Sequence, residues 1–326
     1  MFRELLFLGN PIIDITCKYD RRVIDDVFGT VPEPGHYPIE TLLSLEARAP
    51  HLHFAGASGG AFTAAAVAAG SCAGVSYYGS CGRDFGLFKS IAEKQGFALF
   101  DPAGNRTEAA GRCLLFLGEQ GTLGTHGEAV AGPFVNRGAA ALFGSEMMPP
   151  ISRTSLPFIE GYLMANWQQL PEFAAESCAI DLSSVFVIPQ IRPMIDQLKQ
   201  LKNMIIFANQ EEAEMLLGAD LGQARSPSHA FHHNAVRFCQ GRHVLVVKAA
   251  HNGAVVFSSG SSAENPTWVA ASKVPGGKVL DSSNAGDCFA GAFLASLMQG
   301  GDMKTAAVHG ADAGAICVSR YGNGFA

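Results

Sequence analysis

The segment Val279–Leu294, VLDSSNAGDCFAGAFL, carries the most informative pattern in the chain. Its first half consists of small and polar residues, which favour a turn. Beyond it, Phe289, Phe293 and Leu297 recur at helical spacing until Gly300-Gly301. The pattern predicts a turn that opens directly into a helix.

The start of this expected helix is a candidate anion site that contains an acid. The backbone N–H groups of Asn284, Ala285 and Gly286 would have no partner within the helix, and the positive end of the helix dipole would lie behind them. A carboxylate at position 287 would repel an anion, so its presence in an anion site needs a chemical reason. Accepting a proton from an attacking hydroxyl group would be such a reason. The alternative is that Asp287 only occupies a first helical turn, where aspartate is common.

Composition excludes several classes of protein. The 326 residues are 48% apolar and 16% charged, with a net charge of −6 and no basic run. Such a chain buries a large core, as one large domain or two, and it does not resemble a nucleic-acid binder. The eight cysteines form no CxxC pair, so we expect reduced core residues.

No membrane or export segment is expected. The apolar run near the N-terminus has four residues, which is too short for a signal-peptide core, and so a cytoplasmic location is expected. The uncharged stretch 54–82 is interrupted by glycines and is predicted to form a turn, a buried helix and a strand.

Short apolar runs alternate with amphipathic segments along most of the chain. This alternation predicts a mostly parallel sheet with helices on both faces. The expected strands are Leu5–Leu8, Val75–Tyr78, Phe158–Leu163, Ala179–Leu182, Met204–Ala208 and Val244–Val247, and the expected helices include Phe85–Gln95, Arg192–Lys202 and Glu211–Leu217.

Two stretches break this alternation. Residues 16–50 are rich in proline and residues 111–130 are rich in glycine, and neither shows a clear helix between strands. We expect them to form a small β-rich lid over the carboxyl edge of the sheet, where open α/β sheets bind ligands. The core would then comprise residues 1–15, 51–110 and 131–326.

The segment Asp281–Phe293 resembles the second signature of the PfkB (ribokinase-like) carbohydrate kinase family, D-T-x-G-A-G-D-x-F-x-G-G-F. The resemblance implies a ribokinase-like three-layer α/β/α fold with a β lid, and it favours the adenosine-kinase-like branch. Further segments follow the order of the family's motifs, namely Gly9–Asp14, Gly59-Gly60, Gly79–Gly86, Thr107–Leu117, Glu160–Leu163, Asp181–Ser183 and Asn209–Glu212.

The resemblance also implies an activity. The protein would transfer the γ-phosphate of ATP to a hydroxymethyl group of a sugar or nucleoside, with Asp287 as the general base and the amides of residues 284–286 as the anion hole. Adenosine kinase is the more specific alternative. The substrate-binding residues that the resemblance implies are Asp14, Asn10, Gly59 and Gly60.

The same resemblance suggests where the cofactors bind. Asn209 and Glu212 would order Mg²⁺ through water, and Lys248, Gly253 and Asn323 would lie at the nucleotide. A monovalent cation is a further candidate cofactor. Asn209-x-x-Glu212 after an apolar strand is also a capping-box pattern, and this alternative stays open.

Three residues depart from the family's pattern. Asn284 stands where the anion loop has its first glycine, and its side chain has the reach to crowd the transferring phosphate. Ala64 replaces a sugar-binding asparagine, and Ala250 replaces a glycine near the expected nucleotide. These changes leave open a member of the fold that binds a ligand without turnover.

A different enzyme class also fits one local pattern. Gly56–Gly60 matches G-x-S-x-G between a strand-like and a helix-like segment, which makes Ser58 a candidate hydrolase nucleophile, with Asp287 and His309 following in order. A P-loop is excluded because Val279 follows Gly276–Lys278. The expected partners are a small-molecule sugar or nucleoside, with no nucleic acid and no membrane, and a homodimer is left open.

Overall fold

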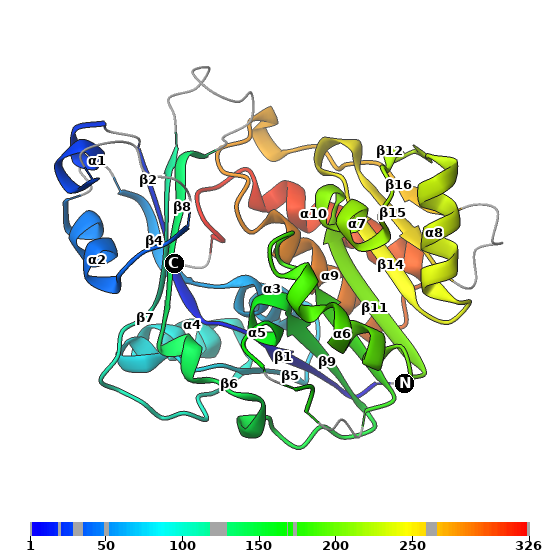
Figure 1. Cartoon of the computed structure of the whole chain (residues 1–326), viewed down its shortest axis with the longest axis horizontal. Helices are drawn as coiled ribbons and strands as arrows, with labels where there is room; N and C mark the ends of the chain where they lie inside the picture. The colour runs from blue at the N-terminus through cyan, green and yellow to red at the C-terminus, as the bar shows by residue number, and fades with distance from the viewer. Residues whose placement is uncertain are drawn as a thin grey trace.

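A nine-stranded sheet forms the centre of the protein, in the order β16-β15-β14-β11-β10-β9-β1-β5-β6 (Figure 1). The computed structural model describes residues 2–18, 21–28, 35–48, 52–117, 129–167, 169–171, 175–258 and 266–324. The strands from β14 to β6 are parallel, and β15 and β16 return antiparallel at one edge. The strands are β1 (Glu4–Leu8), β5 (Val75–Tyr78), β6 (Ala98–Phe100), β9 (Ser155–Glu160), β10 (Ser177–Asp181), β11 (Asn203–Asn209), β14 (Val244–Lys248), β15 (Ala254–Phe257) and β16 (Thr267–Val269).

Helices cover both faces of this sheet, so the predicted three-layer arrangement is confirmed. Successive residues of a strand point to opposite faces, and β1 shows this directly: Leu5 and Phe7 enter one apolar core, whereas Leu6 and Leu8 enter the other. The first core contains α3 (Gly60–Ala69), α4 (Phe85–Gln95), α9 (Ala285–Met298) and α10 (Met303–Cys317), and the second contains α5 (Gly161–Met164), α6 (Ile188–Leu198), α7 (Gln210–Leu217) and α8 (His229–Cys239).

Two predicted boundaries were wrong. The strand expected over Phe158–Leu163 ends at Glu160, and the apolar run continues as the short helix α5. The helix expected over Arg192–Lys202 spans Ile188–Leu198, so it both begins and ends four residues earlier. In both cases the apolar residues are buried whichever element holds them, and a continuous buried run does not distinguish a strand from a helix.

A second sheet of five strands has the order β3-β8-β7-β2-β4 and stands beside the main one (Figure 1). Two helices belong to this region, and α2 packs on β7 and β8 through the buried side chains of Leu42 and Leu45. The elements are β2 (Ile12–Lys18), β3 (Gly35–His36), β4 (Leu52–Ser58), β7 (Ala110–Leu117), β8 (Ala129–Gly138), α1 (Arg21–Phe28) and α2 (Ile39–Arg48).

The expectation that residues 16–50 contain no helix was therefore wrong. The prolines at 32, 34 and 38 lie between α1 and α2, so they separate two helices rather than exclude them. The sheet also includes residues 12–15, 52–58 and 131–138, which were expected in the core. Residues 118–128 lie outside the described part of the chain. The division into core and lid stays a prediction.

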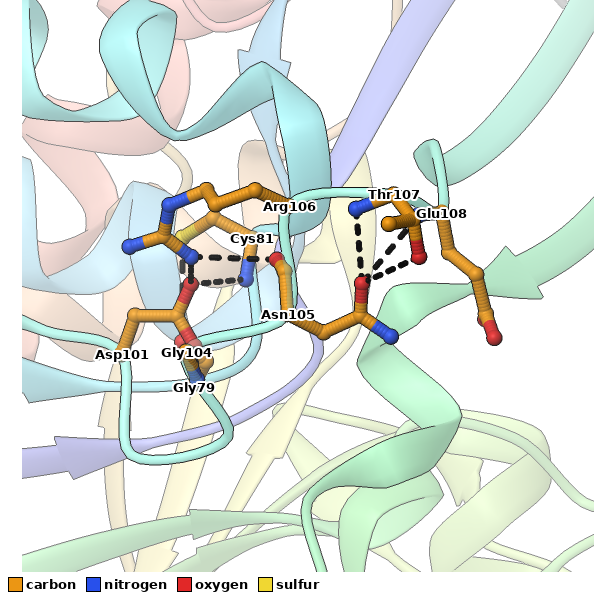
Figure 2. A network of polar contacts seen from close by, with 8 residues as sticks. All are labelled: Gly79, Cys81, Asp101, Gly104, Asn105, Arg106, Thr107 and Glu108. Carbon is orange, nitrogen blue, oxygen red and sulfur yellow. Dashed lines mark hydrogen bonds and ion pairs between the residues drawn. The ribbon is translucent and has the colours of Figure 1, made fainter.

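A polar network fixes the loop that leads from β6 to β7, where the chain passes from one sheet to the other (Figure 2). The Asp101 carboxylate accepts hydrogen bonds from the Cys81 amide (3.2 Å), the Gly104 amide (3.2 Å) and Arg106 (2.5 Å). The Asn105 side chain accepts a bond from the Thr107 amide at 2.8 Å. This network joins the glycine-rich turn after β5 to the base of the second sheet.

Two expectations from composition can be compared with the structure. All eight cysteines are free, and six of them are buried. The uncharged stretch 54–82 forms most of β4, then α3 and β5, as expected. Among the described helices, none combines the length and the apolar character that crossing a membrane requires.

Candidate active site

The N-terminal end of α9 is open. Asn284 precedes the helix in a left-handed conformation, with φ 61° and ψ 0°, and its side chain makes no capping hydrogen bond. The first bond of the helix runs from the Cys288 amide to the Asn284 carbonyl (2.9 Å). In the described part of the chain, no group accepts a hydrogen bond from the amides of Ala285, Gly286 and Asp287.

The Asn284 side chain turns away from this helix end. Its Nδ2 donates to Asp14 Oδ2 (3.1 Å), and its Oδ1 accepts from Ser58 Oγ (3.0 Å) and Thr63 Oγ1 (3.4 Å). Asparagine tolerates the left-handed backbone that glycine adopts freely. The side chain is thus bonded to Asp14, Ser58 and Thr63 and does not fill the space above the amides.

The Asp287 carboxyl group faces the diglycine turn at the start of α3. A methyl group placed on Gly60 would lie 3.0 Å from Asp287 Oδ1. A methyl group on Gly291 would lie 2.3 Å from the Ala64 carbonyl oxygen, so α3 and α9 are in close backbone contact. Ala64 is fully buried in this contact. The close packing of α3 against α9 holds Gly60 beside Asp287.

The surroundings of Asp287 disfavour its charge. Burial raises the pKa of Asp287 to about 7, the charge of Asp181 adds to this effect, and Lys248 opposes it. The residue as a whole is nonetheless partly exposed. A carboxyl group that changes charge near neutral pH is suited to proton transfer.

A cation lies beside the open helix end. Lys248, at the end of β14, binds Asp181, at the end of β10, with Nζ 2.7 Å from Oδ2. A methyl group on Gly286 would lie 3.0 Å from Lys248 Nζ. Burial alone would lower the pKa of Lys248, but the carboxylates around it raise the pKa above its ordinary value. The ammonium group therefore stays charged next to the free amides.

Asp181 was not predicted as a site residue. It is the last residue of the buried strand β10, at the carboxyl edge of the sheet, which is where ligand-binding residues of such sheets lie. This position at the end of an apolar run was the feature of the sequence that could have identified Asp181 as a site residue. The pairing with Lys248 depends on β11 lying between β10 and β14, which the sequence does not reveal.

The predicted acceptor residues lie on the other side of Asp287. Burial raises the pKa of Asp14, whereas hydrogen bonds from Ser58 and Asn284 lower it. Gly59 has φ 95°, and a methyl group there would lie 2.2 Å from the Asn10 carbonyl oxygen, so only glycine fits. The Asn10 side-chain amide is fully buried and has no hydrogen-bond partner among the described residues. An orphaned amide of this kind suits a group that meets a ligand or water.

Glu160 is a second residue that the sequence analysis missed. It ends β9 and is 3% exposed, and its Oε2 accepts a hydrogen bond from the Asn10 amide at 3.0 Å. Burial raises the pKa of Glu160 to about 8, and backbone hydrogen bonds from Asn10 and Ala61 oppose this. Glu160 thereby ties the loop after β1 to the start of α3.

Asn209 and Glu212 form the capping box that was left open as an alternative. The Asn209 side chain accepts from the Glu212 amide (2.8 Å), and Glu212 Oε2 accepts from the Asn209 amide (2.8 Å). Glu212 Oε1 accepts from Asn209 Nδ2 (2.9 Å), so both carboxylate oxygens are engaged. Burial, and then Asp181, raise the pKa of Glu212 to about 7.

These contacts bear on the predicted magnesium site. Across the described residues, no cluster of three or more histidine, cysteine, aspartate or glutamate side chains could hold a metal directly. Mg²⁺ usually keeps several waters and binds phosphate oxygens as well as one or two carboxylates. Asp181, Glu212 and Asp287 interact with a single Lys248, so the excess negative charge fits a cation held through water.

Two residues predicted at the nucleotide, Gly253 and Asn323, make their close contacts with residues other than Asp181, Glu212, Lys248 and Asp287. Gly253 turns the chain between β14 and β15 with φ 87°, and a methyl group there would lie 2.0 Å from the Val269 carbonyl oxygen. The Asn323 side chain is buried and donates to the Ala57 carbonyl (3.0 Å) and to Thr63 (3.2 Å). Their contacts are thus structural, and a role at the nucleotide stays a prediction.

The structure gives no support to the hydrolase alternative. Ser58 does lie between a strand and a helix, but it is fully buried and its hydroxyl group contacts Thr63 (3.2 Å) and Asn284 (3.0 Å). His309 lies exposed on α10, and no histidine bonds to Ser58 in the described ranges. A nucleophilic serine needs an adjacent base and access to substrate.

Comparison with known proteins identifies relatives of this chain. The family described as pfkB family carbohydrate kinase matches residues 161–326. A probable sugar kinase protein from Rhizobium etli CFN 42 is similar over 99% of this chain and 95% of its own, with 22% identity and a TM-score of 0.76. No curated protein matches the sequence.

Two adenosine kinases have similar structures. The enzyme from Sinorhizobium meliloti is 20% identical over 99% of this chain and 96% of its own, with a TM-score of 0.75. The enzyme from Schistosoma mansoni in complex with 2-fluoroadenosine is 15% identical over 99% of this chain and 98% of its own, also with a TM-score of 0.75. These likenesses confirm the ribokinase-like fold that the sequence motifs implied.

Proposed function

Because the chain belongs to the pfkB family of carbohydrate kinases, we propose that it transfers the γ-phosphate of ATP to a hydroxymethyl group of a sugar or nucleoside. One observation supports this most strongly. The start of α9 combines free amides, the carboxyl group of Asp287 and, beside Gly286, the ammonium group of Lys248, which interacts with Asp287. An anion site flanked by a base and a cation is what phosphoryl transfer requires.

Asp287 acts as the general base. It accepts the proton of the acceptor hydroxyl group as the oxygen attacks the γ-phosphate, and base assistance of this kind contributes about 10²- to 10⁴-fold in rate. Its pKa of about 7 matches the task, because a base works best when its pKa lies near the operating pH. Gly60 leaves the carboxyl group the space to face the acceptor.

The helix end and Lys248 stabilise the transferring phosphoryl group. The amides of Ala285 and Gly286 and the dipole of α9 favour the charge on its oxygens, and a single such donor is worth about 3 to 4 kcal/mol in a site that excludes water. Asp181 holds Lys248 beside Gly286. The Asn284 side chain is directed toward Asp14 and leaves this space open, which favours an active enzyme over a binding protein without turnover.

Magnesium fits the acidic side of the site. Glu212 and Asn209 would order its water shell, since both oxygens of Glu212 are already engaged in the capping box. When bound, the ion supplies positive charge that neutralises the phosphates. A monovalent cation, the nucleotide roles of Gly253 and Asn323, a homodimer and a cytoplasmic location stay predictions from the sequence.

On the acceptor side, Asp14 would bind the hydroxyl groups, with Asn10, Gly59 and Gly60 beside it. The solved structures of adenosine kinases favour a nucleoside, and adenosine kinase activity is our narrower proposal. The unpartnered amide of Asn10 is consistent with a polar acceptor. Nucleic acid is not proposed as a substrate, because the chain has no basic run.

The test is ADP release from Mg-ATP with a panel of about twenty nucleosides and sugars, each also examined by thermal shift. We expect one class of acceptor to raise ADP release well above the rate with ATP alone. The same compound should raise the melting temperature, because a ligand at 100 times its dissociation constant stabilises by about 2.7 kcal/mol. A panel that stabilises the protein without any ADP release would favour the non-catalytic alternative.

A further inference from the structure

We infer that the side chain of Asn284 is a positioning residue for the acceptor, which orients Asp14 and couples the acceptor-binding strand to the phosphate-binding end of α9. The inference rests on the proposed function and extends it to a residue that departs from the family's pattern. Asn284 stands where the family has glycine, and a glycine has no side chain with which to make these contacts.

The contacts of the Asn284 amide join three separate elements. Nδ2 donates to Asp14 of β2 at 3.1 Å, and Oδ1 accepts from Ser58, the last residue of β4, at 3.0 Å and from Thr63 of α3 at 3.4 Å. Asp14 is 270 residues away in the sequence. Asn323 extends the same network through Thr63. A single side chain therefore holds the second sheet, α3 and the start of α9 together.

This use of asparagine differs from the one that its place in the helix would predict. Asparagine before a helix commonly accepts hydrogen bonds from the first amides, which stabilises the helix by about 1 kcal/mol. Here no such bond forms, and the backbone is in the left-handed region at φ 61°. The side chain forms bonds to Asp14, Ser58 and Thr63 and no capping bond. It therefore stabilises the arrangement of these residues and not the end of the helix.

The bond to Asp14 acts on the charge and the orientation of that carboxylate. Asp14 is surrounded by other groups that titrate: Asp281 before α9, Asp287 on α9, and Cys113, its register partner on β7. A hydrogen bond from a neutral amide favours the ionised carboxylate without adding charge. A carboxylate offers about four acceptor positions, so the bond from Asn284 leaves positions for acceptor hydroxyl groups.

The first test compares Asn284→Gly with a control in the same loop, Ser282→Ala, whose side chain is exposed. Glycine adopts the left-handed backbone without strain, so the loop should fold. We expect Asn284→Gly to raise the acceptor KM about 10-fold or more, as for the loss of a hydrogen bond to a charged group, while kcat and the KM for ATP change less than about 3-fold. The Ser282→Ala control should match the wild type in all three constants.

The second test uses the isosteric Asn284→Asp and measures acceptor affinity calorimetrically, without ATP, between pH 6 and pH 8. Two carboxyl groups at this distance share one proton at low pH and repel each other once it is lost. The affinity of Asn284→Asp should therefore fall as the pH rises, whereas the wild-type affinity should hold or rise as Asp14 ionises. A residue with only a structural role would give parallel profiles.

The outcomes separate this inference from the proposed function. An unchanged acceptor KM in Asn284→Gly, or parallel pH profiles, would overturn the inference and leave the kinase proposal intact. A wild-type protein that binds an acceptor but releases no ADP would refute the kinase proposal, and the calorimetric comparison would still decide the role of Asn284. Failure of every acceptor in the panel to bind would overturn both.

Discussion

Two helices of this protein begin at an asparagine and carry an acid at the third helical position, yet their ends are used in opposite ways. At α7, Asn209 has φ −76°, and its side chain and that of Glu212 close the end in a capping box. At α9, Asn284 has φ 61° and its side chain donates a hydrogen bond to Asp14 instead of capping the helix. The Asp287 carboxyl group faces Gly60. In these two helices, the backbone conformation of the asparagine determines whether its side chain caps the helix or leaves the first amides free.

The consequence is chemical. At the closed end of α7, the amides of Asn209 and Glu212 are bonded to side chains, so these two donors are not available to a ligand. The open end of α9 keeps its amides free and has Lys248 beside them.

The largest effect is expected from filling the open end. Gly286→Ala would place a methyl group 3.0 Å from Lys248 Nζ, in the space proposed for the phosphate. We predict a loss of about 100-fold or more in kcat/KM for ATP, comparable with the removal of one donor from an anion hole. Folding should be unimpaired, because alanine favours helices over glycine.

The matched control for this substitution is Glu211→Ala, at the second position of α7, where the side chain is exposed. Its steady-state rate should stay within about 2-fold of the wild type. Equal losses in Gly286→Ala and Glu211→Ala would mean that the two helix ends do not differ in function.

The pH dependence of catalysis should follow the ionisation of Asp287. Asp287 must be deprotonated to act as a base, and its pKa is raised to about 7. We predict that kcat/KM rises about 10-fold per pH unit below pH 6 and levels off above pH 7 to 8. A flat profile from pH 5.5 to pH 8.5 would contradict the role of Asp287.

Removing the cap at the closed end should affect stability. Asn209→Ala deletes the acceptor of the Glu212 amide, so we predict that the free energy of unfolding falls by about 0.5 to 2 kcal/mol in denaturant titrations. Asp287→Asn should show no such loss, since its side chain caps nothing. At pH 8 it should even be stabilised relative to the wild type.

The sign at Asp287 follows from its raised pKa. The folded state binds the Asp287 proton more tightly than the unfolded state does, so the favourable contribution exists at low pH and is lost as the pH rises through about 7. Stabilisation by Asp287→Asn should therefore be larger at pH 8 than at pH 5. The opposite order would show that ionised Asp287 is stabilised by its neighbours.

The smallest effect is expected at Ala250. Like Asn284, this residue has a left-handed backbone and stands where the family's pattern has glycine. Its φ is 49°, a conformation that disfavours alanine by about 1 to 2 kcal/mol. Ala250→Gly should raise the melting temperature slightly, because relief of this strain exceeds the added entropy of the unfolded chain. A lower melting temperature would show that the strain is absent.

The sequence alone predicted the parts of this comparison that depend on local pattern. Small residues before a helical apolar spacing predicted the start of α9, and Asn-x-x-Glu allowed the capping box as the alternative to a magnesium site. The family motifs indicated Asp287, Asp14 and the diglycine turn. Each of these signals lies within a few residues of the feature it describes.

The remaining features depend on contacts between distant segments. The direction of the Asn284 side chain is set by Asp14 and Ser58, which lie far away in the sequence. The pair of Lys248 and Asp181 depends on strand order. The helices α1 and α2 beside the second sheet were not predicted, because the proline-rich sequence around them suggested loops. Packing against the rest of the protein stabilises such short helices, and this packing cannot be read from the local sequence.

The most direct test of the central claim is a comparison of Asp287→Asn with Glu211→Gln, measuring ATP binding by calorimetry and phosphoryl transfer by single-turnover kinetics on the same samples. We predict that Asp287→Asn binds ATP within about 3-fold of the wild type while transfer falls by about 10²- to 10⁴-fold, and that Glu211→Gln changes neither. Transfer by Asp287→Asn at the wild-type rate would exclude Asp287 as the general base.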